Sequence, residues 1–328
     1  MMEAAASART EPPPDVAISV EGLSKSFSGH MVVDHLTMRV MRGQIYGFLG
    51  PNGSGKTTTI RMLCGLLTPD SGEGTCLGMN IRTEARKIRE RVGYMTQRFS
   101  LYQDLSVREN LEFVARVYGV PQPEKAATAA LERLGLAGRG KQLAGSLSGG
   151  WKQRLALGAC ILPSPDLLLL DEPTAGVDPK ARREFWAQIH DLAADGLTVL
   201  VSTHYMDEAE RCHEIAYIAY GKLLAQGTVA NVIAASGLST WTVEVTGVEG
   251  HAAGQLVSSL SRSLSARPGV DMVAPFGTQL HISGRDAVAL EAAIESFRGD
   301  PRLVFRKDAP TLEDVFIDLM GRSKDDLR

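Results

Sequence analysis

The chain has 328 residues, of which 44% are hydrophobic and 22% charged, and its formal net charge is −3. This length can bury a sizeable core and favours two domains. The charge balance excludes the basic footprint typical of nucleic-acid-binding proteins, and no apolar run approaches the roughly 18 residues of a membrane span.

Residues 1–14 lack the basic-then-apolar order of a signal peptide, so we predict a disordered N-terminal lead. The cysteines are scattered without metal-ligand spacing, which is typical of reduced thiols in a cytosolic protein. There are four of them: Cys64, Cys76, Cys160 and Cys212.

Two patterned segments, 16–20 and 32–40, are punctuated by glycines and predict short antiparallel strands. They lead into a buried strand at 45–49. Phe27 is placed in the loop between the first two strands, where a single aromatic residue usually packs locally.

Residues 50–58, GPNGSGKTT, follow the buried strand at 45–49 and match the phosphate-loop pattern G-x-x-x-x-G-K-[ST] between a strand and a helix. Glycines let the backbone approach a polyphosphate closely, and the helix that follows turns its positive end toward it. Lys56 is predicted to reach the β- and γ-phosphates, and the Thr57 hydroxyl to bind Mg²⁺. The predicted nucleotide-binding residues here are Gly50, Pro51, Asn52, Gly53, Ser54, Gly55, Lys56, Thr57 and Thr58.

The middle of the chain is predicted to be helical, over about residues 98–160. Ser106 and Glu109 form an S-x-x-E capping box. Further helices are predicted at 124–134 and 151–161.

A continuous apolar run at 167–170 predicts a strand buried on both faces, and it ends in Asp171 and Glu172. Asp178 is predicted to cap a helix that has Pro179 in its first turn. Strands at 197–202 and 215–220 complete an alternation of strands and helices that predicts a parallel sheet.

The C-terminal part is predicted to be a separate α+β domain. Residues 231–240 are interpreted as a linker. Residues 241–328 follow a β-α-β-β-α-β order, which predicts a ferredoxin-like domain, and end in a helix that begins at about residue 310.

Six motifs occur together in order: the phosphate loop, Gln97, an LSGGQ-like stretch at 147–153, the strand ending in Glu172, Asp178, and His204. Over residues 16–230 the set resembles the nucleotide-binding subunit of an ATP-binding cassette (ABC) transporter. The resemblance implies an α/β P-loop NTPase fold over 15–230, with a mostly parallel sheet, an antiparallel β subdomain and the helical insert.

The resemblance also implies roles for single residues. Glu172 would act as general base on the attacking water, and His204 would contact the γ-phosphate, although a histidine after a strand is often structural. Asp171 would hold Mg²⁺ through water, and Gln97 would touch Mg²⁺ or the water. The implied cofactors are therefore ATP and Mg²⁺; Phe27 would stack on adenine, and Asp178 would organise water across a dimer interface besides capping its helix.

The signature residues Ser148, Gly149 and Gly150 would contact the nucleotide of a second ATP-binding subunit, most simply in a homodimer. A helix start with flanking glycines is a suitable anion site. Trp151 stands where the family usually has Gln, so a contact by that Gln side chain is not implied here.

Two further stretches, at 97–111 and 310–316, resemble bacterial drug-resistance (daunorubicin-type) exporter ATPases. That resemblance implies separate integral-membrane permease subunits of the type-2 exporter kind, a membrane-fusion protein as a further candidate partner, and a location at the cytoplasmic face of the inner membrane. Phe99, Leu101 and Tyr102 are candidates either to line a groove for the permease or to pack between subdomains.

Two alternative functions follow from the same cassette. One is a soluble ABC ATPase acting on ribosomes or DNA, which the single cassette and the absence of a basic patch disfavour. The other is an importer ATPase. Within the export hypothesis, drugs or other hydrophobic small molecules are favoured as cargo by resemblance alone, and the C-terminal domain could bind a regulatory ligand or stabilise a dimer.

Overall fold

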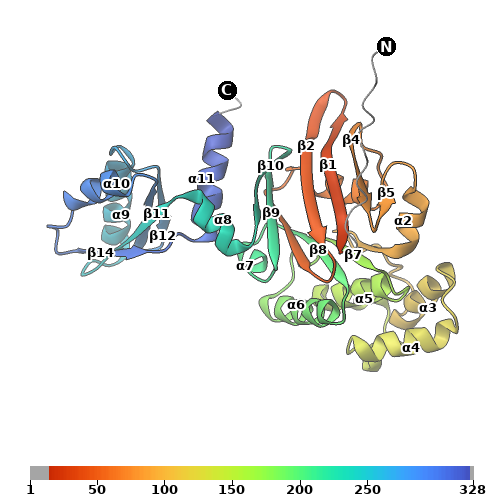
Figure 1. The fold of residues 1–328 in the computed structure, drawn as a ribbon. Helices are drawn as coiled ribbons and strands as arrows, with labels where there is room; N and C mark the ends of the chain where they lie inside the picture. Colours follow the sequence, from red (N-terminus) through yellow and green to blue (C-terminus); the bar gives the residue numbers. More distant parts are fainter. Residues whose placement is uncertain (1–14, 326–328) are drawn as a thin grey trace, which may run out of the picture. The chain divides into compact units, whose positions relative to one another are not determined.

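The computed structural model describes residues 15–325, with side chains as far as residue 322 (Figure 1). The predicted lead at 1–14 lies outside the described residues. The chain divides into two compact units between Leu223 and Leu224, and each is described by itself.

The first unit begins with an antiparallel sheet in the strand order β2-β1-β4-β5. Its strands are β1 (Val16–Phe27), β2 (His30–Met41), β4 (Ser71–Cys76) and β5 (Met79–Asn80). The first two strands are longer than predicted, and Phe27 ends β1 instead of lying in a loop. The reason is the two-residue turn Ser28-Gly29, in which both residues have positive φ (51° and 83°), so the twisted strands run on to a tight hairpin.

The second sheet carries the predicted parallel core. Its strand order is β10-β9-β3-β8-β7-β6, and β9, β3, β8, β7 and β6 pair in parallel. The three central strands, β3, β8 and β7, are buried along their whole length, as the apolar run at 167–170 predicted. The bounds are β3 (Ile45–Leu49), β6 (Val92–Met95), β7 (Leu167–Asp171), β8 (Thr198–Thr203), β9 (Glu214–Ala219) and β10 (Lys222–Gly227).

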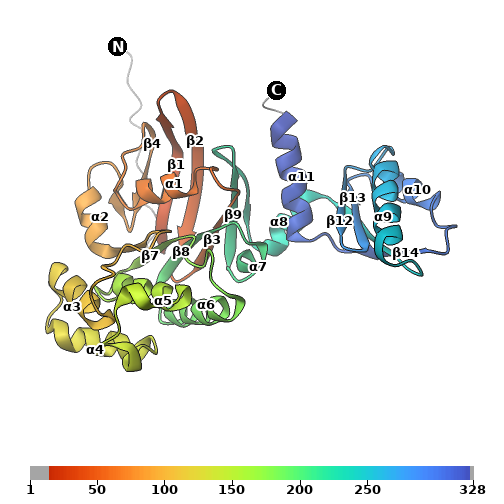
Figure 2. The same ribbon diagram turned by 180° about the vertical axis from the view of Figure 1, so that it is seen from behind.

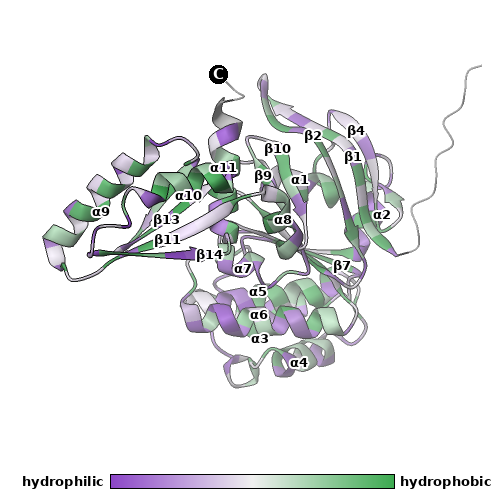
Figure 3. Ribbon diagram, turned by 60° about the vertical axis from the view of Figure 1, so that its left-hand side comes forward, coloured by the Kyte–Doolittle hydropathy of each residue, from purple (hydrophilic) through white to green (hydrophobic). Residues whose placement is uncertain are grey.

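Seven α-helices of the first unit are described, and Figure 2 shows several of them from the opposite side. They are α1 (Lys56–Leu63), α2 (Ala85–Arg91), α3 (Val107–Val117), α4 (Pro123–Arg133), α5 (Gly149–Ile161), α6 (Pro179–Ala194) and α7 (Met206–Ala209). The capping box is confirmed, because the Ser106 hydroxyl accepts from the Glu109 amide and the Glu109 carboxylate accepts from the Ser106 amide. Longer helices such as α6 alternate hydrophobic and hydrophilic residues (Figure 3).

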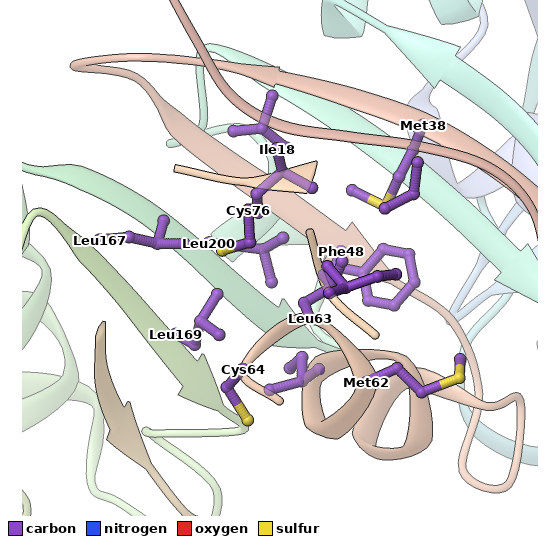
Figure 4. Close-up of a cluster of buried hydrophobic side chains, with 14 of the residues drawn as sticks. Ile18, Met38, Phe48, Met62, Leu63, Cys64, Cys76, Leu167, Leu169 and Leu200 are labelled. Atoms are coloured by element: carbon purple, nitrogen blue, oxygen red, sulfur yellow. The ribbon is translucent and has the colours of Figure 1, made fainter. Parts of the chain in front are cut away.

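The main core of this unit joins the antiparallel sheet to one face of the parallel sheet (Figure 4). Ile18 of β1, Phe48 of β3, Leu63 of α1, and Leu167 and Leu200 of the parallel strands pack in it, each 0% exposed. Full burial of such side chains contributes about 1.5–3 kcal/mol each. The core therefore holds the ends of β3 and β7, from which the polar loops described below emerge.

The second unit confirms the ferredoxin-like prediction. Its antiparallel sheet has the order β12-β13-β11-β14, and its core includes residues of α9 and α10. The elements are β11 (Ser239–Val245), α9 (Gly250–Ser265), β12 (Met272–Phe276), β13 (Gln279–Gly284), α10 (Ala287–Glu295), β14 (Leu303–Asp308) and α11 (Leu312–Asp325).

The prediction of a linker at 231–240 is wrong, because most of this segment is helical. Helix α8 (Val229–Ser236) starts where the Thr228 hydroxyl accepts from the Asn231 amide. It ends at Gly237, whose φ of 65° supplies the left-handed conformation of a helix end. Within the described residues, no helix is long and apolar enough to cross a membrane.

Candidate functional site

The glycine-rich loop lies between β3 and α1, and its shape depends on backbone close to neighbouring strands. A Cβ atom on Gly50 would lie 2.1 Å from the Ile218 carbonyl oxygen, and one on Gly55 would lie 2.5 Å from the Val32 carbonyl oxygen. Gly55 also has a φ of 104°. These positions therefore require glycine, as the motif predicted.

Gly55 is the N-cap of α1 and has no side chain that could cap the helix. The first backbone amides of α1 are therefore left without a side-chain acceptor. Lys56 follows, and its side chain is only 4% exposed. Its Nζ atom donates hydrogen bonds to the carbonyl oxygens of Gly50 (2.7 Å) and Pro51 (3.0 Å). Burial lowers the pKa of Lys56, and the nearby Glu172 carboxylate partly offsets this effect.

Asp171 ends β7 and meets two hydroxyl groups. The Thr57 hydroxyl donates to its Oδ1 atom at 3.1 Å, and the Ser202 hydroxyl donates to the same oxygen at 2.8 Å. Strands β7 and β8 are neighbours, which brings Ser202 opposite Asp171. The structure thus brings together two of the three predicted magnesium ligands, Thr57 and Asp171, whereas the third, Gln97, hydrogen-bonds to Glu172.

Glu172 is the centre of the site. Its side chain is 8% exposed, and its two oxygens lie near three different groups: Oε1 is 3.3 Å from Lys56 Nζ, while Oε2 accepts from Gln97 Nε2 at 3.1 Å. The third is His204, whose Nδ1 is 3.3 Å from Oε2. This histidine nitrogen is close enough for an ion pair, but it is not aligned for a hydrogen bond with any described residue.

The backbone of Glu172 is also unusual, with a φ of 48° that a non-glycine residue seldom adopts. The Ser202 hydroxyl accepts a hydrogen bond from the Glu172 amide at 3.0 Å and the Ser202 carbonyl lies 3.1 Å from the same nitrogen. Such strain clusters at functional sites where surrounding contacts hold it. Ser202 was not among the predicted site residues; its place at a strand end, two residues before His204, is the signal that could have found it.

Only part of this group lines one pocket, because the predicted residues Gly50, Pro51, Asp171 and His204 are not in its lining. Its walls include Asn52, Gly53, Ser54, Gly55, Lys56, Thr57, Thr58, Gln97 and Glu172, together with Val32. Phe27, at the end of β1, is 46% exposed and lies outside this lining, with the Lys25 ammonium 5.6 Å from its ring centroid.

The signature residues lie at a different pocket. Ser148 is the N-cap of α5 and its hydroxyl makes no capping hydrogen bond. The pocket is lined by Ser148, Gly150, Trp151, Arg154, Asp178, Lys180, Ala181 and Glu184, none of which lines the phosphate-loop pocket. The Trp151 ring lies beneath two guanidinium groups, those of Arg139 (4.4 Å) and Arg154 (4.9 Å).

Asp178 fulfils the predicted capping role, because its carboxylate accepts from the amides of Lys180 (3.1 Å) and Ala181 (3.0 Å). Its side chain is exposed at the start of α6. Gly149 begins α5 beside Ser148. The three signature residues and Asp178 therefore lie together, apart from the pocket that contains Lys56 and Glu172.

The residues present fit a nucleoside triphosphate with Mg²⁺. The buried Ser54 hydroxyl and the His204 Nδ1 atom both lack hydrogen-bond partners among the described residues, although buried polar atoms are normally paired. The oxygens of Thr57 and Asp171 are of the hard kind that Mg²⁺ prefers, and few protein ligands are usual when phosphates supply the others.

A further groove lies between β6, α3 and α5. Its lining includes Tyr94, Leu101, Val114, Tyr118 and Cys160. Of the three residues predicted for a permease groove, Leu101 lines it, whereas Phe99 and Tyr102 do not. Tyr102 is 52% exposed and packs edge-on against Phe113, with ring centroids 5.1 Å apart.

Comparison with known proteins agrees with this geometry. The ABC transporter family model matches residues 33–175. An Escherichia coli protein named "probable multidrug ABC transporter ATP-binding protein" is 46% identical over 219 residues; the match covers 66% of this chain but only 38% of that protein. The Nod factor export ATP-binding protein I of Ralstonia nicotianae is 37% identical over 97% of this chain and 100% of its own length.

Solved structures of other proteins give the same result. A Clostridium perfringens protein that is part of an ABC transporter complex has a TM-score of 0.62 and 30% identity, covering 67% of this chain and 91% of that one. A dimeric ATP-binding cassette bound to ADP and Pi has a TM-score of 0.60 and 25% identity, covering 64% of this chain and 98% of that one. This chain therefore belongs to the family of ABC transporter ATP-binding proteins.

Proposed function

We propose that the chain binds and hydrolyses ATP with Mg²⁺ and thereby drives export through a separate membrane permease. The observation that carries the proposal is the convergence of Lys56, Gln97 and His204 on the single carboxylate of Glu172, at the mouth of a phosphate loop. Phosphoryl transfer is catalysed mainly by positioning and charge stabilisation, and this group of side chains supplies both.

Within this proposal each residue has a distinct task. Residues 50–58 cradle the phosphates with backbone amides and the Lys56 ammonium. Glu172 accepts the proton of the attacking water, and Gln97 and His204 orient that water and the γ-phosphate. Bound Mg²⁺, held by Thr57 and Asp171, would neutralise charge on the phosphate oxygens. Phe27 is proposed to stack on the adenine ring.

The second pocket completes the proposal as a shared active site. Ser148, Gly149, Gly150 and Asp178 lie away from their own chain's phosphate loop, so they are proposed to contact the nucleotide of a second subunit. One related cassette was solved as a dimer bound to ADP and Pi, which supports this arrangement. ATP then stabilises a closed homodimer, because it contacts both chains only when they are together.

The membrane partner is proposed to dock in the groove between β6, α3 and α5. The groove has an apolar lining that includes Leu101 and Val114, and the exposed rings of Tyr102 and Phe113 lie next to it. Such a surface suits an amphipathic helix from a permease of the type-2 exporter kind.

The names of two relatives include "multidrug" and "Nod factor export", so we propose a hydrophobic small molecule as cargo and the cytoplasmic face of the plasma membrane as the location. A membrane-fusion protein is a further proposed partner.

The direct test is ATP hydrolysis by the wild-type chain and by Glu172→Gln. Hydrolysis should fall at least about 100-fold in the variant, because the general base is lost, while ATP binding persists and traps a dimer visible by size exclusion. The exposed Glu210→Gln is the matched control and should behave as wild type. Normal hydrolysis by Glu172→Gln, or a wild-type chain whose specific activity does not change on dilution to the monomer, would contradict the proposal.

A further inference from the structure

A third buried carboxylate of the first unit, Glu208, lies next to the site just described, after Asp171 and Glu172. It belongs to the short helix α7 and is 0% exposed. Its Oε1 atom accepts a hydrogen bond from the Thr174 hydroxyl, and its Oε2 atom accepts one from the Thr203 hydroxyl at 2.6 Å. The Thr203 hydroxyl in turn accepts from the Tyr205 amide at 3.1 Å, which fixes its orientation.

A cation from α6 lies against the same carboxylate. Arg182 Nε is 3.5 Å from Glu208 Oε1, within ion-pair distance. The guanidinium also lies over the ring of Tyr205, 4.2 Å from its centroid. The Tyr205 ring in turn packs on the ring of His204, with centroids 4.1 Å apart and planes tilted by 37°.

These contacts join the three segments that carry the site. Thr174 lies two residues after Glu172, Thr203 ends the strand before His204, and Arg182 lies in the helix that Asp178 caps. Each segment contributes one direct contact to Glu208. A displacement of any one segment therefore disturbs the contacts of the other two.

We propose that Glu208, with Arg182 and Tyr205, is a positioning unit that holds His204 against Glu172 and links that arrangement to the start of α6. The proposal rests on the function proposed above for Glu172, His204 and Asp178. The unit does not touch the reacting atoms; it acts through the orientation of the His204 ring and the backbone on either side of it. Small misplacements of catalytic groups reduce turnover strongly, so this role is visible in kcat.

The test compares Glu208→Gln and Arg182→Met with two controls one or two residues away, Glu210→Gln and Arg183→Met, whose parent side chains are exposed. In each test variant kcat should fall about tenfold or more while KM for ATP changes by less than about twofold. The double variant Glu208→Gln/Arg182→Met should lose no more than the worse single variant, because both substitutions break one unit. The two control variants should keep wild-type constants.

Thermal unfolding of each variant separates this role from simple support of the fold. A structural role predicts a lower Tm with kcat unchanged in the folded protein at low temperature, and that result would overturn the proposal. So would additive losses in the double variant. If wild type and Glu172→Gln hydrolyse ATP equally, the proposed function fails instead; if Glu172→Gln is inactive while Glu208→Gln and Arg182→Met retain full kcat, only the positioning unit fails.

Discussion

Lys56 Nζ lies 3.3 Å from Glu172 Oε1, and the two side chains are 4% and 8% exposed. The phosphate loop and the end of β7 are thus joined by an ion pair almost removed from water. In such a pair each charge offsets the desolvation of the other, so the loss of one partner costs more than the loss of both.

Lys56→Met should consequently destabilise the fold by about 3–5 kcal/mol, because it leaves the Glu172 carboxylate buried beside an apolar side chain. The double variant Lys56→Met/Glu172→Gln should recover about 1–3 kcal/mol of that loss. Urea unfolding of the wild type, both single variants and the double variant gives the coupling energy directly. A double variant that loses the sum of the two single-variant losses would show that the pair is not coupled in the native protein.

Gly55→Ala should abolish ATP binding, because the added methyl group would lie 2.5 Å from the Val32 carbonyl oxygen at a φ of 104°. Gly53→Ala is the matched comparison in the same loop: its φ is 79°, but nothing lies within 4 Å of the added atom. That variant should carry only conformational strain of about 1–2 kcal/mol and keep weakened binding. Titration with a fluorescent ATP analogue measures both, and equal affinities would refute the steric argument.

Acid stability should depend on Asp70. Hydrogen bonds from the Lys25 ammonium and from the Ser26 amide and hydroxyl lower the pKa of Asp70 to about 2. Because the folded pKa lies below the unfolded value of about 3.9, the stabilisation is complete above that value and disappears as the pH falls toward 2.

Asp70→Asn should therefore be less stable than the wild type at neutral pH, and the difference should vanish near pH 2. Unfolding midpoints measured across this range test it, with the exposed Asp104→Asn as control. A difference between wild type and Asp70→Asn that does not change with pH would contradict the assignment.

Mixing two inactive variants tests the shared active site. Lys56→Met removes the phosphate contact and Ser148→Arg blocks the signature helix start, so each variant alone should be inactive. A mixed dimer has one intact pocket, because one chain keeps its phosphate loop and the other keeps its signature, and about half of the dimers in an equal mixture are mixed. Activity should therefore appear on mixing and reach about a quarter of the wild-type value if pockets act independently. No activity at any ratio would argue against pockets that are completed by the second chain. A tandem-linked dimer with one defective pocket is the control, because it shows whether hydrolysis requires both pockets to be intact.

The sequence predicted the phosphate loop well because its constraints are local. Gly50 and Gly55 are required by backbone approach, and the strand and helix on either side follow from short patterns. Asp171 and Glu172 were placed correctly for a related reason, since polar residues after a fully buried strand must lie at the sheet edge. The capping roles of Ser106 and Asp178 were equally local.

Other features depend on contacts far apart in the sequence. Glu208 occurs in the polar stretch MDEAE, which reads as a solvated helix, and only the packing of α6 and β8 around it makes it buried. Helix α8 was interpreted as a linker because its residues are mostly small and show no clear hydrophobic period. Its N-cap residue, Thr228, also precedes the segment that was interpreted as the linker. Phe27 was assigned to a loop because the alternation of apolar and polar residues ends well before it. In the structure, a tight hairpin turn lets both strands continue to Phe27 and His30.

The separation of the Ser148 pocket from the Lys56 pocket has a genetic consequence. If each active site takes half of its residues from each chain, an altered chain spoils sites that a normal chain has helped to build. Where transport requires both pockets of a dimer, only about a quarter of the dimers in a cell that makes equal amounts of normal and defective chains have two intact pockets, so transport falls below the half that the normal copy supplies. Substitutions on either surface are thus expected to be dominant over the wild-type allele, whereas substitutions that prevent folding would be recessive.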